Sequence, residues 1–527
     1  MDDTTPTFDT PAPDAGSGRR GRRASGGASA RRAARTGGGI TQARYITRNI
    51  PEFEVLNEEA LAIIEANAET VLQEVGVNFV DNPDALQRWR EAGADVQGER
   101  VRLPKGLART LCATAPSQYT QHARNPERSV EVGGKNTIFA PVYGPPFVRD
   151  LEHGRRYATI SDFEALVKLV YMSPYLHHSG GTLCEPTDVA VNKRHLDMLY
   201  AHMRYSDKPY MGSVTEPSRA ADSVAMSKIL FGDEFVEQNA VMTSLININS
   251  PLTFDNVMMG ALEVYARHNQ AAIVSPFIVG GAMAPVSAVG TLTQVLAEVM
   301  AGVAYSQLIR PGAPVIFGAF VTSIDMNSGA PTFGTPEANM ILTGAGQLAR
   351  RMNLPFRSGG SLCGSKLPDA QAAFESANTI LPALQAGVNF ALHSAGWLEG
   401  GLVTSFEKLV MDADQLGALH VLAKGVDIGT EAQAMDAIAE VGPGGHYLGC
   451  GHTQRNFETA FWRSRLFDYK PFETWLEEGE RDTAALAHQR MKTLLGEYVA
   501  PPLDPGIDEG LRDFIARRKE SEPDAFA

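Results

Sequence analysis

The stretch 271–320 constrains the fold of this chain more than any other. Residues 272–279 are apolar on both faces of an extended segment, as a strand inside a parallel sheet must be. Two glycines then break the strand, and residues 289–308 form an almost wholly apolar helical segment with a single charge, Glu298. A second apolar strand follows at 314–320. Strand, helix and strand in this order predict a parallel βαβ unit whose helix lies outside the sheet.

The alternative for the apolar helix is a membrane span. Its length would allow one, but polar side chains interrupt the apolar run at six positions, namely Thr291, Thr293, Gln294, Glu298, Ser306 and Gln307. We therefore expect a buried helix of a globular protein and no membrane association. The net charge of −14 also disfavours nucleic acid and anionic membrane surfaces as partners.

The first part of the chain differs in composition from the rest. Residues 1–44 carry eight arginines, four aspartates and almost no large apolar side chains, which predicts a disordered basic tail. No apolar segment follows the arginines, as a secretion signal would require. The four cysteines lie far apart in sequence and form no CxxC pair. These features predict a cytoplasmic protein.

The centre of the chain alternates strands and helices regularly. Helical patterns separate eight apolar strand candidates, which lie at 137–142, 178–183, 210–214, 241–248, 272–279, 314–320, 354–358 and 388–393. This alternation predicts an α/β fold, a (β/α)8 TIM barrel over residues 126–430. Residues 45–125 predict a small, mostly helical N-terminal segment, and residues 431–527 a helical C-terminal extension. An open doubly wound sheet is the alternative, which the count of eight and the lack of a dinucleotide fingerprint disfavour.

In a barrel, functional side chains lie where strands end and the following loops begin. Glycine pairs follow predicted strands 2, 5 and 7, where they would let a bulky ligand approach the backbone. The predicted strands contain no lysine, which disfavours Schiff-base chemistry, although Lys366 lies just beyond strand 7. His446, Cys450 and His452 lie close together but match no standard zinc pattern, so we expect no bound metal.

Eight segments carry a resemblance to a known family. They are VLQEVGVNFVDNPDAL (71–86), SPLTFDN (250–256), GGAMAPVSAVGTLTQVLAEVMAG (280–302), PGAPVIFGAF (311–320), GTPEANM (334–340), KLPDAQAAFE (366–375), FEKLVMD (406–412) and VGPGGHYLGCGHTQRNF (441–457). Together they resemble the trimethylamine methyltransferase family of corrinoid-dependent methyltransferases. The resemblance implies a barrel that moves a methyl group from a methylamine to the cobalt of a separate corrinoid protein. No cofactor is then bound in this chain itself.

The resemblance also bears on the substrate. Founding members of the family carry pyrrolysine, which we expect to align near the end of strand 7, where this chain has only ordinary residues from Phe356 to Lys366. Relatives without pyrrolysine are associated with quaternary amines such as glycine betaine. The resemblance therefore implies a methyltransferase that demethylates a betaine and passes the methyl group to the Co(I) of a corrinoid protein.

The chemistry of a quaternary amine agrees with this choice. Methyl departure leaves a neutral tertiary amine, so no general acid is needed. The substrate has no N–H donors, so aromatic faces and acidic charge must recognise it. The candidate aromatic residues near the mouth are Tyr143, Phe147, Phe277, Phe320 and Phe356, and the candidate acidic residues are Glu185, Glu216, Asp325 and Glu337. A substrate carboxylate would require a cation, and the candidates are Arg357, Lys366 and His452, with His446 as a further substrate-binding candidate.

Two other functions remain open from the sequence. One is a barrel enzyme of another class, such as a demethylase that uses folate instead of a corrinoid. The other is a non-catalytic protein that binds quaternary amines. We expect the partners to be a corrinoid protein and a small quaternary or tertiary amine, and the long C-terminal extension favours a homo-oligomer.

Overall fold

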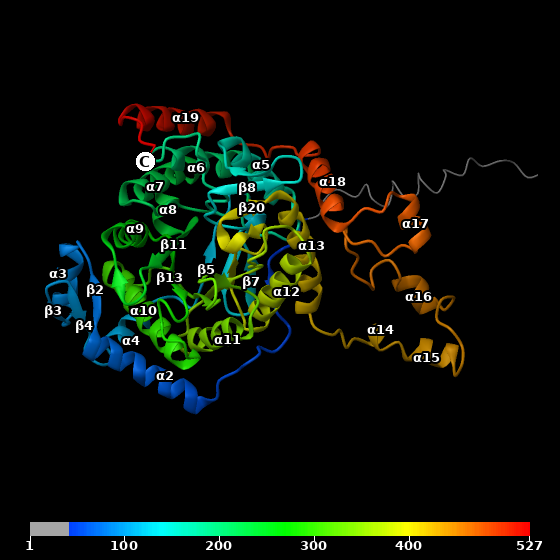
Figure 1. The fold of residues 1–527 in the computed structure, drawn as a ribbon, viewed down its shortest axis with the longest axis horizontal. Coiled ribbons are helices and arrows are strands. Elements are labelled where there is room, and N and C mark those ends of the chain that lie inside the picture. Colours follow the sequence, from blue (N-terminus) through cyan, green and yellow to red (C-terminus); the bar gives the residue numbers. More distant parts are fainter. Residues whose placement is uncertain (1–41, 527) are drawn as a thin grey trace, which may run out of the picture. The chain divides into compact units, whose positions relative to one another are not determined.

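The computed structural model describes residues 42–526, so all but the last three positions of the predicted disordered tail lie outside it. Seven parallel strands form its centre (Figure 1). Their order in the sheet is β7-β18-β17-β14-β13-β11-β10, which pairs the first strand along the chain with the last. The sheet therefore curls round, and its only break lies between β7 and β10. The strands are β7 (Asn136–Phe139), β10 (Tyr210–Met211), β11 (Met242–Ile248), β13 (Ala271–Val279), β14 (Val315–Gly318), β17 (Phe356–Gly359) and β18 (Phe390–Leu392).

The strand predicted at 178–183 is not a regular strand. Its backbone still bonds to both neighbours, because the His177 N–H donates to the Phe139 carbonyl (3.0 Å) and the Met211 N–H donates to the Gly180 carbonyl (2.9 Å). Gly180 has a φ of +88°, which lies outside the β region and interrupts a regular ladder. This irregular segment thus lies between β7 and β10. The fold is a mixed α/β fold with a curled parallel sheet.

Eight helices follow the strands along the chain and surround the sheet (Figure 1). Helix α10 is long and apolar enough to cross a membrane by length and composition, but 78% of its most apolar stretch is buried inside the protein. The expectation of a buried core helix is met. The helices are α5 (Ile160–Met172), α6 (Arg194–Tyr205), α7 (Pro217–Phe231), α9 (Asn256–Arg267), α10 (Ala288–Ile309), α11 (Pro336–Arg351), α12 (Ala370–Gln385) and α13 (Phe406–Ala423).

Apolar side chains fill the inside of the curled sheet. Ile138, Leu245, Ile273 and Ile316 from four strands belong to one buried cluster. A hairpin of β5 (Gln118–Gln121) and β6 (Val130–Gly133) adds Val130 and Val132 to the same cluster. The interior is therefore a packed core, and ligands can enter only beyond it, where the strands end.

The N-terminal segment contains more strand than its sequence predicts. Its helices are α2 (Glu58–Thr70), which continues into a π-helical turn at Val71–Val75, α3 (Pro83–Glu91) and α4 (Leu107–Cys112). Between them, β2 (Val77–Phe79), β3 (Asp95–Gln97) and β4 (Arg100–Arg102) form a small sheet with β12 (Thr253–Phe254) from the centre of the chain. Short two- and three-residue strands carry too little periodicity to be read from sequence. A further strand, β1 (Ile46–Thr47), pairs antiparallel with β7.

Two small sheets build up the loops after the strands. One joins β8 (Phe147–Asp150) and β9 (Gly154–Tyr157), which follow β7, to β19 (Trp397–Leu398) and β20 (Val403–Ser405), which follow β18. The other continues β13 beyond β14, by pairing it with β15 (Phe320–Ile324), which in turn pairs with β16 (Pro331–Thr332). Both sheets therefore belong to the face at which the parallel strands end.

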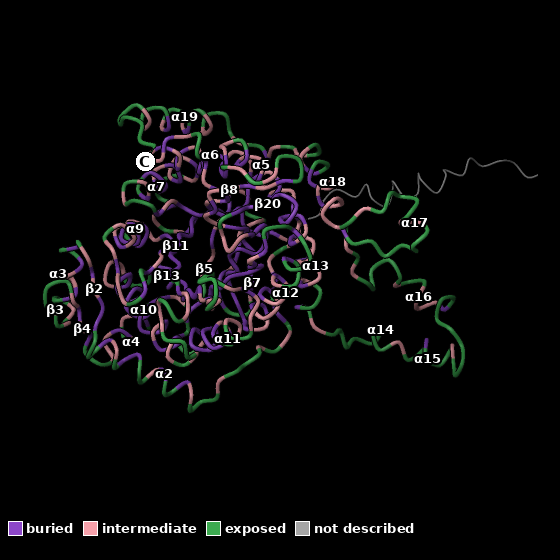
Figure 2. The backbone as a smooth tube through the Cα atoms, viewed as in Figure 1, coloured by how far each residue is buried: buried purple, intermediate pink, exposed green. Residues whose placement is uncertain are grey.

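The C-terminal part consists of helices, and their burial divides it in two. Helices α18 (Thr483–Gly496) and α19 (Pro505–Glu520) pack on the helices around the sheet. Between α13 and α18 lie four short helices, α14 (Thr430–Gln433), α15 (Met435–Val441), α16 (Gly451–Asn456) and α17 (Phe472–Glu477). Figure 2 shows this intervening stretch almost entirely exposed. We call residues 426–476 the arm.

Candidate functional site

Five aromatic rings gather near the ends of β13, β14 and β18. Phe277 and Phe320 stack with their ring centroids 5.2 Å apart and their planes at 9°. The imidazole of His393 meets the Trp397 indole edge-on at 4.5 Å, and Phe320 lies 6.0 Å from the same indole. Phe333 completes the group at 6.1 Å from Trp397. Phe277 is 44% exposed whereas Phe320 is 6% exposed, so this aromatic cluster opens to solvent at Phe277.

A buried arginine lies beneath the aromatic cluster. Arg357 on β17 is 1% exposed, and its guanidinium carbon lies 5.7 Å from the centre of the Phe320 ring. One terminal nitrogen donates to the Ser275 hydroxyl (3.1 Å), while Nε–H has no partner. No carboxylate lies within 4.0 Å of this guanidinium among residues 42–526. Burial lowers the pKa of Arg357 to about 9, so the group is still charged at neutral pH.

His393 faces donors on both sides. Its Nδ1 lies 3.2 Å from the backbone N–H of Tyr143, and accepts it when the proton of the neutral ring sits on Nε2. That Nε2 lies 3.1 Å from the second terminal nitrogen of Arg357, which can also only donate. Burial and the Arg357 charge hold the pKa of His393 well below its usual value, so the ring is neutral. A neutral imidazole accepts at one nitrogen only, so His393 cannot accept from both Tyr143 and Arg357, and the buried Arg357 also keeps its Nε–H without a partner.

Strain and a buried ion pair fix the loop that carries His393. His393 has a φ of +63°, a conformation that costs free energy in any residue other than glycine. Three residues later the Gly396 N–H donates to Asp412 on α13 (2.9 Å), and the Lys408 ammonium pairs with the same carboxylate. The Cys363 thiol donates to the Trp397 carbonyl (3.0 Å). These contacts hold the rings of His393 and Trp397 in place.

Two predicted aromatic residues lie beside this group. Tyr143 is half-buried, and burial raises the pKa of its hydroxyl to about 12. Phe147 packs against the apolar cluster that contains Phe320 and Trp397. Its ring also lies 3.6 Å from the guanidinium of Arg155, so one face of Phe147 is already occupied by a cation of the chain itself.

The other predicted site residues do not join the aromatic cluster. Phe356 lies on the opposite face of β17 from Arg357, where its ring lies beside Phe317 and Gly346 of α11. Glu185 pairs with Arg194 (2.8 Å) and Glu216 with Arg219 (3.4 Å). The exposed Lys366 ammonium donates to the Gly364 carbonyl (2.9 Å), and Asp325 accepts from its own turn at Asn327 and Ser328. Glu337 lies in the first turn of α11.

His446 and His452 lie in the arm. His446 is exposed, and His452 contacts only arm residues, Glu431 and Asn456. Nothing in the described chain brings either imidazole to the aromatic cluster. No group of three or more His, Cys, Asp or Glu side chains suited to a metal ion is present among residues 42–526.

Sequence reasoning missed four residues of the site: Ser275, Phe333, His393 and Trp397. The signal for His393 was its position as the last residue of predicted strand 8, and Trp397 lies in the loop that follows. The missing information was the pairing of β13 with β15, which brings Phe277 and Phe320 face to face. That pairing joins residues more than 40 positions apart.

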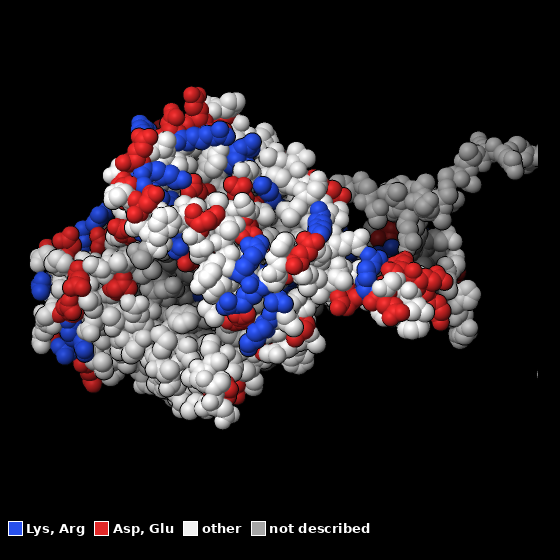
Figure 3. Space-filling model, turned by 45° about the horizontal axis from the view of Figure 1, so that its top comes forward, with Lys and Arg blue, Asp and Glu red and all other residues white. Residues whose placement is uncertain are grey.

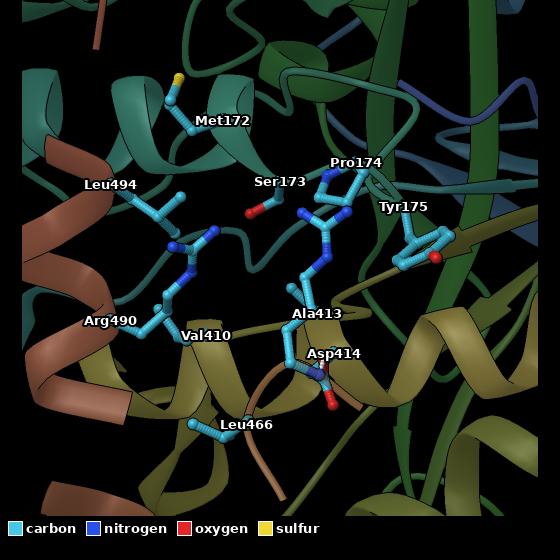
Figure 4. A pocket seen from close by; sticks show the side chains of 11 residues that line it. Met172, Ser173, Pro174, Tyr175, Val410, Ala413, Asp414, Leu466, Arg490 and Leu494 are labelled. Atoms are coloured by element: carbon cyan, nitrogen blue, oxygen red, sulfur yellow. Dashed lines mark hydrogen bonds between the residues drawn. The ribbon is translucent and has the colours of Figure 1, made fainter. Parts of the chain in front are cut away.

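A separate pocket lies away from the strand ends. It encloses about 40 Å³ and is lined by apolar side chains of α5, α13 and α18, by Leu466 and by the charged residues Asp414, Arg465 and Arg490. In Figure 4 the Arg490 side chain reaches from α18 toward Ser173. No lining residue comes from the end of a strand, so this pocket is not part of the aromatic cluster.

The structure is that of a curled parallel sheet with a charged and aromatic group at its strand ends. Comparison with known proteins identifies the family to which it belongs. The chain belongs to the trimethylamine methyltransferase (MTTB) family, whose model matches residues 23–523. The chain is also similar in fold to the crystal structure of Methanosarcina barkeri monomethylamine methyltransferase (MtmB). The TM-score is 0.50 at 12% identity, over 86% of this chain and 90% of that one.

Among individual relatives, the chain is 41% identical to a glycine betaine methyltransferase of Desulfitobacterium hafniense (strain Y51), over 89% of this chain and 98% of the relative. It is 28% identical to the proline betaine:corrinoid methyltransferase of Eubacterium limosum, over 79% of this chain and 86% of that one. It is 27% identical to the trimethylamine methyltransferase MttB of Methanosarcina thermophila, over 87% and 95%. The family resemblance seen in the sequence is thus confirmed.

Proposed function

We propose that this protein takes a methyl group from a betaine, with glycine betaine as the first candidate, and passes it to the Co(I) of a separate corrinoid protein. Family membership and the 41% identity to a glycine betaine methyltransferase support the reaction. One structural observation carries the choice of substrate. Beside a set of aromatic rings, the buried Arg357 has no counter-ion and an unpartnered Nε–H, and His393 cannot accept from both of its donor neighbours.

The carboxylate of the betaine supplies the missing acceptor. Arginine N–H groups bind carboxylates strongly because the planar fork matches the two oxygens. In this assignment the carboxylate accepts from Arg357 and from Nε2–H of His393. It also neutralises a charge that is buried without a counter-ion, which relieves the cost of burying it. Trimethylamine has no carboxylate and would leave the N–H donors of Arg357 and His393 without this acceptor.

The aromatic cluster receives the quaternary ammonium end. The ring faces of Phe277 and Trp397 carry no charge, which suits a trimethylammonium group, and Phe320 stacks behind Phe277. The free face of the half-exposed Phe277 marks the side from which the substrate enters. A betaine held by its carboxylate at Arg357 then points its methyl groups toward solvent and the partner protein.

The residues of this chain act by orientation. Transfer breaks a C–N bond and leaves the electron pair on nitrogen, so the product is a neutral tertiary amine and no proton is required. The corrinoid of the partner supplies the Co(I) nucleophile. The clamp of Arg357 and His393 at one end and the rings at the other hold one methyl group in line for attack, which is the largest contribution a rigid site can make here.

The corrinoid protein docks, in this proposal, on the face where the strands end. Five large apolar side chains are exposed there, four on loops and Phe374 near the start of α12, and we call them the rim: Val286, Met326, Leu367, Phe374 and Leu402. An exposed apolar group of this kind is typical of an interaction surface. Figure 3 shows charges of both signs interspersed over one face of the molecule, which suits a protein partner better than a nucleic acid.

We also propose that the curled sheet is a closed (β/α)8 barrel. The segment 177–180 supplies the eighth position, and its hydrogen bonds to Phe139 on one side and Met211 on the other support this closure. A cytoplasmic location fits the four cysteines, which are all free and buried.

The test is a methyl-transfer assay with reduced corrinoid protein and a panel of amines. Glycine betaine, proline betaine, tetramethylammonium and trimethylamine are compared by the absorbance of methyl-cobalt. We expect turnover with a betaine and much weaker turnover with tetramethylammonium, which lacks the carboxylate. Turnover of trimethylamine alone, or turnover without corrinoid protein, would overturn the proposal.

A further inference from the structure

The arm, residues 426–476, exposes an unusual amount of apolar surface. Twelve large apolar side chains in it are at least 43% exposed: Val426, Ile428, Met435, Ile438, Tyr447, Leu448, Phe457, Phe461, Phe467, Tyr469, Phe472 and Leu476. Only Ala437, Cys450 and Leu466 are buried. A stretch this apolar does not remain exposed to water in a stable protein, and it therefore marks an interaction surface.

The rest of the chain hardly supports the arm. The described hydrogen bonds and ion pairs of residues 426–463 all stay inside that segment, for example those of Glu431 with His452 and Arg455. Contact with the body begins at Trp462, whose indole lies against Gly417 of α13, and continues where Ser464 and the Arg465 N–H donate to Asp414 on the same helix. The four helices of the arm have at most seven residues each, far below the length at which an isolated helix is stable.

We propose that the arm docks on a second copy of this chain, and that two copies exchange their arms. Two partners are conceivable, the corrinoid protein and another copy. A methyl carrier must bind and leave in every turnover, and transient interfaces of this kind are small. Twelve apolar side chains could not stay exposed to water between such transient binding events. A permanent partner is required, and a second copy is always present.

The size of the exposed surface agrees with this assignment. A buried aromatic side chain covers 150–250 Å², so the twelve half-exposed side chains offer roughly 100 Å² each. One arm then contributes on the order of 1,200 Å² of apolar surface, and two exchanged arms about twice that. Permanent homodimer interfaces bury ~2,000 Å² or more and are hydrophobic.

The pocket of Figure 4 continues the same surface onto the body. Arg465 and Leu466 of the arm line it together with Val410, Ala413 and Leu494 of α13 and α18. Among the described residues, neither Arg465 nor Arg490 has a carboxylate oxygen within 4.0 Å. In this proposal, the surface that binds a partner's arm extends from the apolar arm into a pocket with two unpaired guanidinium groups.

The test is the mass of the full-length protein by light scattering at micromolar concentration. We compare the wild type with a double variant of the arm, Phe461→Asp and Tyr469→Asp, whose side chains are 76% and 77% exposed. The matched control is Val499→Asp, also 77% exposed but outside the arm. We expect an oligomer for the wild type and the control. In the double variant, the dissociation constant should rise at least about 100-fold.

A second measurement guards against misfolding of the variant. Hydrogen exchange of the wild type should show protected amides in residues 426–476 when the protein is concentrated, and their protection should disappear on dilution. A monomeric wild type would overturn the proposal, as would an oligomer unaffected by the double substitution. If the arm became protected only on addition of corrinoid protein, it would belong to that partner and the proposal would be wrong. The amine panel above is independent of all these outcomes.

Discussion

At the scale of single residues, Arg357 combines full burial with a missing counter-ion. A buried charge without a partner costs several kcal/mol, and a protein retains one only where the charge is used. Its neighbours do not neutralise it, because neither Ser275 nor the neutral ring of His393 carries a charge. This combination, which no single residue type in the sequence reveals, is the reason why we propose Arg357 as the carboxylate-binding residue.

We predict that Arg357→Gln lowers kcat/KM for glycine betaine by roughly 10- to 100-fold, the value of hydrogen bonds to a charged group. Its effect on tetramethylammonium should be small, because that substrate has no carboxylate. Thermal stability should not fall, since an unpaired buried charge is removed. The control is Arg219→Gln, which removes an arginine paired with Glu216. Equal losses for both substrates would contradict the role assigned to Arg357.

The exposed ring of Phe277 gives a second residue-scale prediction. Phe277→Leu keeps the apolar volume but removes the π face, so KM for a quaternary amine should rise about 2- to 30-fold, the range of a cation–π contact. The melting temperature should hardly change, because the ring is 44% exposed. Steady-state kinetics measure the effect, with Phe53→Leu, 58% exposed and outside the site, as control. An unchanged KM would exclude Phe277 from ammonium binding.

At the scale of elements, regular strands were predictable and irregular ones were not. The apolar runs at 272–279 and 314–320 gave β13 and β14 within a few residues, because burial on both faces leaves a continuous signal. The predicted strand at 178–183 lacks such an apolar run, and its Gly180 adopts a positive φ that interrupts a regular strand. Of the aromatic cluster, Phe277 and Phe320 were predicted from the sequence, whereas Phe333, His393 and Trp397 were not. The alternation of side chains along a strand does not say which face points inward.

The buried carboxylate of Glu298 links helix α10 to the loop after β11. It accepts from the Ser250 hydroxyl and from the Leu252 N–H, each at 2.7 Å, and burial raises its pKa. Glu298→Gln keeps an acceptor for Leu252 and should change the free energy of unfolding by less than about 1 kcal/mol. Glu298→Leu leaves both donors without an acceptor and should lower the free energy of unfolding by about 2–4 kcal/mol. Urea denaturation measures both, and equal effects of the two variants would exclude these hydrogen bonds as the cause.

At the scale of the whole molecule, the sequence predicted the order of the segments along the chain better than it predicted where each segment packs. Residues 126–430 were assigned to one α/β unit, and the seven parallel strands lie within them. The arm was assigned to a helical extension, and its histidines to the site, because sequence proximity of His446 and His452 cannot show where the segment packs. A segment whose partner is another molecule leaves no contact in its own chain to predict.

Buried histidines give the molecule as a whole a defined response to acid. Burial lowers the pKa of His177, His178, His202, His393 and His420 below the usual value, to about 4 for His202 and His420. Below about pH 6.5 the unfolded chain therefore binds protons that the folded chain does not. The stability is fully present above that pH and is lost as the pH falls toward the folded pKa values.

We predict that the free energy of unfolding falls by at least about 2 kcal/mol between pH ~7 and ~5, at up to ~1.4 kcal/mol per pH unit for each histidine. Asp412 and Asp414, whose pKa values burial raises, act in the opposite direction and offset only part of the loss. Urea denaturation across this range measures the slope. His420→Gln, which removes one ring of the 2.8 Å pair with His177, should make the slope shallower. A flat profile would mean that these rings are protonated without cost, and that their burial does not govern the acid response.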